Sequence, residues 1–219
     1  MSKLFYKSYE VELKHNPKLK NTYIGVRANK KIVVKTSNSS HSYILSILEL
    51  RDSWIEKQFQ KQQTHISLEV NLEDELLLFS QRYSIDSQEA TLLREKLNKL
   101  RVNSKKNILK SYDEFYKIVA KTYLSQRAEY YSSLMGLSYN EIKYRKMRSR
   151  WGSCSSKKII TFNTELIKVD KTLIDYVVVH ELAHLKHMNH SKDFHSLVAI
   201  YLPESKQLRN SLKKISLRS

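Results

Sequence analysis

The stretch HELAHLKHMNH, residues 180–190, contains four of the eight histidines of this 219-residue chain. With the three valines before it, the run VVVHELAHL is apolar and free of Gly and Pro, so we predict a buried helix there. His180 and His184 are then about 40° apart around the helix and ~6 Å apart along its axis. Both imidazoles point from one face, so their nitrogens can converge on a single metal ion ~2.0–2.1 Å away.

The third ligand is either His187 or His190. His187 lies on the same face, but its rise of ~10.5 Å from the first histidine is too far for one ion to bridge. His190 can return to the ion if the chain turns after Met188. Asn189 tolerates the left-handed backbone that ends a helix, and Ser191 can cap a new one. We therefore predict His190 as the third ligand and keep His187 as the alternative.

Glu181 follows the first histidine and completes an HExxH motif. It is displaced by ~100° around the helix, so its carboxylate can reach a water molecule on the ion without binding the ion itself. Three imidazoles leave the fourth position of Zn²⁺ open to that water, whose pKa falls toward ~7. We predict metal-assisted peptide hydrolysis in which Glu181 takes the proton and later passes it to the leaving amine.

Two further parts of a peptidase site have candidates in the sequence. Arg150, Asn163 and Tyr201 can each stabilise the negative charge that develops on the substrate carbonyl oxygen, and the sequence does not choose among them. The run IITFNTEL, residues 159–166, is expected to be a strand at a sheet edge, against which an extended substrate pairs.

The remaining histidines and the cysteine are interpreted as structural. His195 falls inside the helix that follows the motif, where packing near the site is a more common role than binding a metal. Cys154 has no second cysteine at a metal-ligand spacing, so we assign it a structural role. Three histidines without companions are expected at the surface or in the core of the N-terminal third: His15, His41 and His65.

The composition is that of an ordinary globular protein, with 41% hydrophobic and 28% charged residues. No apolar run approaches the ~20 residues needed to span a bilayer, and the opening stretch MSKLFYKSYE lacks the apolar region of a secretory signal. A single cysteine cannot form an internal disulfide. We therefore expect a cytoplasmic protein that does not contact a membrane.

Basic residues are concentrated in one part of the chain. Of the net charge of +17, residues 96–150 contribute +10, from 14 basic and 4 acidic residues. This excess favours DNA or RNA as a partner, and the run KYRKMRSR, residues 143–150, leads from it into the predicted site. A peptidase recruited to nucleic acid would combine both signals. The alternative interpretation is a solvated Lys-rich surface that aids solubility.

The first 95 residues have the pattern of a β-rich lobe with one helix. Residues 21–36 predict a hairpin that turns at Asn29 and Lys30. Ser40 can cap a helix that continues to about Gln62, with apolar residues at helical spacing. Two more strands are predicted, at residues 65–70 and 76–85.

From about residue 88 the pattern becomes helical and basic, and Gly136 can stop a long helix at Met135. Asp170 can cap the helix that contains the histidine motif. We expect residues 1–95 and 96–219 to be separate domains, the second being catalytic. Between the two helices the pattern predicts a strand, a loop and a strand, at residues 137–147, 148–158 and 159–166.

The spacing of HExxH and His190 is that of the metzincin signature, but metzincins need Gly where this chain has His187, and a Met-turn afterwards. No Met follows Met188, so a metzincin is excluded. A denser match covers residues 143–203. There, RSRWGSCSSKKIITFNTELI and IDYVVVHELAHLKHMNHSKDF resemble the YgjP-like metallopeptidase family, which is related to the SprT-like and WLM peptidases.

This resemblance implies an α+β fold, in which a zincin-like metallopeptidase domain carries an N-terminal β-rich lobe. It also implies a peptide or protein substrate, a catalytic Glu181, and a Zn²⁺ ion held at the positions of His180, His184 and His190. The alternative function is a nucleic-acid-binding protein with a structural zinc site. Glu181 argues against it, because a structural site closes its fourth position with another protein ligand.

Overall fold

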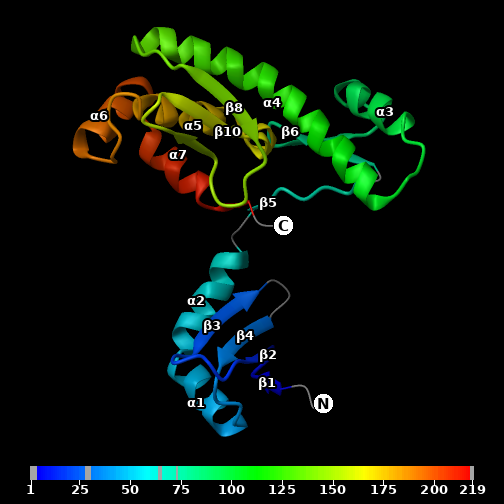
Figure 1. Cartoon of the computed structure of the whole chain (residues 1–219), viewed down its shortest axis with the longest axis vertical. Helices are drawn as coiled ribbons and strands as arrows, with labels where there is room; N and C mark the ends of the chain where they lie inside the picture. Colours follow the sequence, from blue (N-terminus) through cyan, green and yellow to red (C-terminus); the bar gives the residue numbers. More distant parts are fainter. Residues whose placement is uncertain (1–3, 28–30, 64–65, 73, 218–219) are drawn as a thin grey trace. The chain divides into compact units, whose positions relative to one another are not determined.

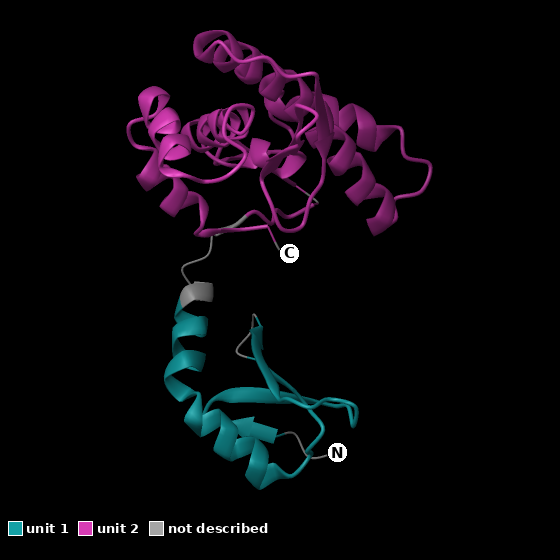
Figure 2. Ribbon diagram, turned by 60° about the vertical axis from the view of Figure 1, so that its left-hand side comes forward, with its two compact units in different colours: residues 1–65 teal, residues 66–219 magenta. Residues whose placement is uncertain are grey.

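The computed structural model describes residues 4–27, 31–63, 66–72 and 74–217 (Figure 1). No helix in this part of the chain is long and apolar enough to cross a membrane. The chain forms two compact units, residues 1–65 and residues 66–219 (Figure 2). His65 and the turn expected at Asn29 and Lys30 lie outside the described residues.

The first unit consists of a four-stranded sheet and two helices: β1 (Leu4–Tyr6), β2 (Tyr9–His15), β3 (Tyr23–Arg27), β4 (Lys31–Thr36), α1 (His41–Leu50) and α2 (Asp52–Gln63). The strand order is β1-β2-β4-β3, and only the central pair is parallel. Ile32 and Val34 of β4 pack against both helices in one apolar core. The antiparallel pairing expected within residues 21–36 is confirmed by β3 and β4.

The single helix expected over residues 40–62 is interrupted at Arg51, where φ is −110° and ψ is 11°. The Arg51 N–H donates to the carbonyl oxygen of Leu48 at 3.1 Å, as in a tight turn. Ile44 and Leu48 of α1 and Ile55 of α2 are buried in the same core. Periodicity does not reveal the interruption, because both helices place apolar residues at the same spacing.

The strands expected at residues 65–70 and 76–85 differ from those in the structure. The first is reduced to β5 (Ile66–Ser67), which pairs in parallel with β11 (Ile215–Ser216). The second is not one strand but an antiparallel hairpin of β6 (Glu75–Leu78) and β7 (Gln81–Ser84).

The β6–β7 turn has no glycine, which is why the sequence contains no turn signal. Phe79 and Ser80 adopt positive φ angles of 50° and 65°, which non-glycine residues rarely adopt. Their N–H groups donate to the carbonyl oxygens of Ile167 and Lys168 at 2.9 and 3.0 Å. Hydrogen bonds from a distant segment therefore stabilise a turn that local propensity does not favour.

The helical pattern from residue 88 corresponds to η1 (Gln88–Ala90), α3 (Thr91–Asn98) and α4 (Lys105–Met135). The Ser104 side chain caps α4 by accepting from the Asn107 N–H. Gly136, at φ 62°, ends it in the left-handed conformation, so the predicted end at Met135 is confirmed.

Residues 66–95 belong to the second unit and share its core. Leu76, Leu78 and Leu93 are buried in the same apolar core as α4. The chain therefore divides at residue 65 by packing. A boundary near residue 95 stays a prediction.

A three-stranded sheet adjoins α4, with strands β8 (Glu141–Arg145), β9 (Gly152–Cys154) and β10 (Ile159–Asn163). Its order is β8-β10-β9, so β10 has a partner on both sides. The expectation that residues 159–166 form a sheet edge is therefore wrong. β9, which lies in the segment expected to be a loop, is an edge of this sheet among the described residues.

The rest of the second unit is helical: η2 (Thr164–Lys168), α5 (Lys171–Ala183), α6 (Lys192–Tyr201) and α7 (Ser205–Leu212). α5 packs against α4, α6 and α7 (Figure 1), and also against β9. The expected α+β class with an N-terminal β-rich lobe is confirmed.

Candidate metal centre

α5 positions the first part of the histidine motif. The Asp170 side chain accepts from the Thr172 N–H at 2.8 Å, which confirms the predicted cap. Val177, Val178 and Val179 are buried in the core. Because α5 has neighbours on several sides, the residues at its C-terminal end are held in fixed directions.

The chain turns earlier than the sequence analysis expects. α5 ends at Ala183 rather than after Met188, and the carbonyl oxygen of Ala183 accepts from the His187 N–H at 2.9 Å. The predicted start of the next helix is confirmed, because Ser191 caps α6 by accepting from the Phe194 N–H. The segment between the two helices brings the chain back toward the end of α5.

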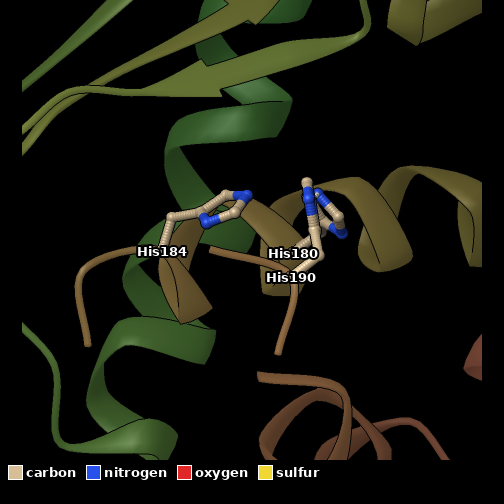
Figure 3. Close-up of side chains that lie close together, drawn as sticks. All are labelled: His180, His184 and His190. Atoms are coloured by element: carbon tan, nitrogen blue, oxygen red, sulfur yellow. Dashed lines mark hydrogen bonds between the residues drawn. The ribbon is translucent and has the colours of Figure 1, made fainter. Parts of the chain in front are cut away.

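Three imidazoles meet at this turn (Figure 3). His180 lies in the last turn of α5, His184 directly follows it, and His190 precedes α6. One nitrogen from each ring lies within 4.8 Å of the other two. The Nε2 atoms of His180 and His190 are 3.1 Å apart. Two nitrogens bound to one tetrahedral ion lie roughly 3.3 Å apart, so this spacing fits a shared ion.

The chemistry of the three rings also suits a metal. Burial lowers the pKa of His180 to about 3, with smaller contributions from the neighbouring His184, His190 and Arg209. Burial likewise lowers the pKa of His190. Neutral imidazoles, which bind metal ions, are therefore favoured.

His187 contributes its main chain and not its ring. Its carbonyl oxygen lies 3.0 Å from His184 Nδ1, a distance suited to a hydrogen bond that leaves Nε2 of His184 free. Such outer hydrogen bonds fix the orientation of a metal-binding imidazole. Of the two candidates for the third position, the structure brings His190 and not His187 into the group.

Phe194 is a contributor that the sequence analysis missed. Its ring is fully buried, and its centroid is 4.5 to 4.9 Å from those of His180, His184 and His190. It therefore provides an apolar wall shared by the whole group. His195 is exposed and lies outside the group, with its ring stacked 6.1 Å from that of His190.

Glu181 is 5% exposed and lies beside the histidines. Burial raises its pKa to about 8, and the charge of Arg150 partly opposes this shift. Gly152 of β9 lies against this side chain: a Cβ atom there would be 2.6 Å from Oε1 of Glu181. Only glycine leaves room for this carboxylate. The sequence gives no sign of that role, because the two residues are far apart in the chain.

The three candidates for stabilising a developing negative charge differ in position. Asn163 is fully buried, and its side chain accepts from the Met147 N–H and donates to the carbonyl oxygens of Met147 and Arg150. It therefore holds the loop before β9. Tyr201 lies at the end of α6. Arg150 lines a pocket together with His180 and Glu181.

Cys154 is half-buried in β9, and burial raises the pKa of its thiol to about 11. It is not among the side chains that gather at the histidines. His15 and His41 are exposed and belong to the first unit.

Solved structures that resemble this chain include two metallopeptidase zymogens. The metallopeptidase zymogen abylysin of Pyrococcus abyssi is 22% identical over 41% of this chain and 90% of its own, with a TM-score of 0.38. The zymogen jannalysin of Methanocaldococcus jannaschii is 21% identical over 41% of this chain and 92% of its own, with a TM-score of 0.37. No curated protein matches.

The family comparison covers most of the chain. The model of the YgjP-like metallopeptidase domain matches residues 20–215, which include every residue of the histidine group. A metallopeptidase requires a metal ion, and the three imidazoles could hold one. The chain therefore belongs to the YgjP-like metallopeptidase family, whose members are hydrolases that act on peptide bonds.

Proposed function

We propose that this chain is a zinc peptidase in which His180, His184 and His190 hold the ion and Glu181 is the catalytic base. The observation that carries the proposal is the group of three imidazoles with a buried carboxylate beside it. Three nitrogen ligands suit Zn²⁺, and this number is typical of catalytic sites. Among the described residues, no fourth His, Cys, Asp or Glu joins the group, as a structural site would require.

A bound Zn²⁺ would supply Lewis acidity at the substrate carbonyl. The protein supplies the proton transfers. Glu181 accepts a proton from the attacking water and delivers it to the leaving amine. Gly152 allows the carboxylate to occupy its buried position. Arg150 lines the same pocket, which supports a role for it in stabilising the negative charge that develops on the carbonyl oxygen.

The edge strand β9 is the proposed docking edge for the substrate backbone. It replaces residues 159–166 in this role, because β10 is already paired on both sides. An extended peptide adds to an exposed strand edge through main-chain hydrogen bonds. Gly152 at the start of β9 contacts Glu181, so a peptide on this edge would pass close to the catalytic carboxylate.

Glu181→Gln tests the proposal. The variant should retain zinc, since Glu181 is not a ligand, and lose peptide hydrolysis by roughly 10²–10⁴-fold. Metal content by elemental analysis and cleavage of a peptide library by mass spectrometry measure the two effects. The matched control is Glu129→Gln, which removes an exposed carboxylate of α4 and should change neither. Retained hydrolysis in zinc-loaded Glu181→Gln would contradict the proposed role of this residue.

Recruitment to nucleic acid is a second proposal, supported by unpaired basic residues before β9. Lys143 and Lys146 are paired with carboxylates, at 3.0 Å from Glu141 and 2.6 Å from Asp113. Arg145 and Arg148 are exposed, and no carboxylate among the described residues lies within 4.0 Å of either. They are the charges most available to phosphates.

Arg145→Glu with Arg148→Glu should weaken DNA or RNA binding and flatten its salt dependence. Each duplex phosphate contact contributes about −0.9 to the log–log slope, and each single-strand contact about −0.7. Filter binding at two salt concentrations measures this slope, with zinc content as the control. If the protein binds neither DNA nor RNA at ~50 mM salt, the recruitment proposal is wrong. The peptidase proposal is unaffected by that result.

A further inference from the structure

A pocket of about 250 Å³ opens beside Glu181 in the second unit. This volume is below the ~300–1,000 Å³ of typical small-molecule sites and suits a single side chain or chain terminus. Three segments form its walls: the loop into β9, the last turns of α5, and the end of α7. Besides Glu181 and His180, its lining includes Arg150, Trp151, Val177, Arg209, Leu212 and Lys213.

The charge of this pocket is predominantly positive. Arg150, Arg209 and Lys213 line it, and Glu181 is the one carboxylate among the lining residues. No carboxylate among the described residues lies within 4.0 Å of Arg209 or Lys213. Arg127 of the same unit, by contrast, has Asp175 at 2.7 Å. The pocket therefore contains positive charge that the protein itself does not neutralise.

The apolar walls strengthen the attraction of these charges for an anion. Val177 and Leu212 are buried, and Trp151 is half-buried. Charges beside apolar side chains are less screened than in open water, so one negative group would be bound more firmly. The planar guanidinium of Arg209 matches the two oxygens of a carboxylate.

We propose that this pocket binds a carboxylate of the peptide substrate through Arg209 and Lys213, next to the bond that is cleaved. The inference rests on the proposed peptidase function and narrows its substrates to peptides with a negative group near that bond. Two sources have this chemistry: an Asp or Glu side chain, which implies cleavage within a chain, and a C-terminal carboxylate, which implies removal of terminal residues.

Binding of three synthetic peptides tests the proposal. They share one acetylated alanine sequence and differ in ending with a carboxylate, with an amide, or with an amide and one internal Glu. Trp151 reports binding by its fluorescence once Trp54, the other of the two tryptophans, is replaced by Phe. Zinc-loaded Glu181→Gln protein prevents cleavage during the measurement.

At least one of the two carboxylate peptides should bind roughly tenfold more tightly than the neutral amide, because the interaction is between opposite charges. The peptide that gains affinity identifies the source. Arg209→Gln or Lys213→Gln should remove most of this difference in affinity between carboxylate and amide peptides. Arg209→Lys should preserve part of the difference. Lys206→Gln, which removes one charge from the same helix outside the pocket, should preserve nearly all of it.

Equal binding of the three peptides would overturn the proposal, and so would an Arg209→Gln variant that keeps the preference. Tighter binding of a short oligonucleotide, abolished by Arg209→Gln, would overturn it in favour of a phosphate site. Cleavage by protein that retains Glu181 is measured separately. Cleavage without a carboxylate preference refutes the pocket proposal alone, and a preference without cleavage refutes the peptidase proposal alone.

Discussion

Among the described residues of the first unit, Thr36 is the one buried non-aromatic polar side chain, and its hydroxyl lies 2.8 Å from that of Thr22. The second unit instead buries ionisable groups, including Glu181, His184 and Lys168. Burying such groups costs free energy unless they are paired. The difference indicates that the first unit is built for packing, whereas the second tolerates unfavourable burial where chemistry requires it.

A second contrast lies within the second unit. Lys168 is 2.7 Å from Glu165, and its ammonium lies 4.3 Å from the ring centroid of Tyr116. Glu165 therefore has a close basic partner within the fold. Glu181 is more deeply buried than Glu165 but has no basic side chain within 4.0 Å among the described residues. Its carboxylate is held ready for a ligand or a proton.

The largest expected effect concerns the histidines. His180→Ala, His184→Ala or His190→Ala should weaken metal binding by more than ~100-fold. This loss exceeds the 10–100-fold loss of affinity that is typical when a hydrogen-bond partner of a metal ligand is removed. His187→Ala should preserve it, because its contribution is a carbonyl oxygen. Zinc titration against a chelator measures the affinities. Loss of metal in His187→Ala with retention in His190→Ala would reverse the proposed ligand assignment.

The second effect concerns the free energy of unfolding and distinguishes the role of Glu165 from that of Glu181. Lys168→Met should lower the free energy of unfolding by about 3 kcal/mol, because Glu165 then remains buried without its closest partner. Lys143→Met, which breaks an exposed pair, should change it by no more than about 0.5 kcal/mol. Urea denaturation measures both. Glu181→Gln should not lower stability, and a large loss there would show that this carboxylate is structural.

The smallest effect concerns the contact between β9 and Glu181. Gly152→Ala should displace the carboxylate and lower kcat/KM by roughly 10–100-fold while zinc is retained. Gly25→Ala in β3 is the matched control, because nothing lies within 4 Å of the added Cβ there. It should leave activity and zinc content unchanged. Full activity in Gly152→Ala would show that Glu181 does not need its observed position.

Local signals predicted much of the second unit. The caps at Asp170 and Ser191 and the stop at Gly136 each depend on one residue and its immediate neighbours. The positions of His180 and His184 follow from helical periodicity. The turn that returns His190 was expected, but its start was placed too late, because α5 ends at Ala183 and not after Met188.

The sequence by itself therefore determined the motif helix and the positions of His180 and His184, because spacing along one helix is a local property. Only the tertiary structure decided that Gly152 contacts Glu181, that Phe194 lies against the three imidazoles, and that Arg209 lines a pocket with His180 and Glu181. These residues come from β9, α6 and α7. Their proximity arises from the packing of those elements on α5, which has no periodic trace in the sequence.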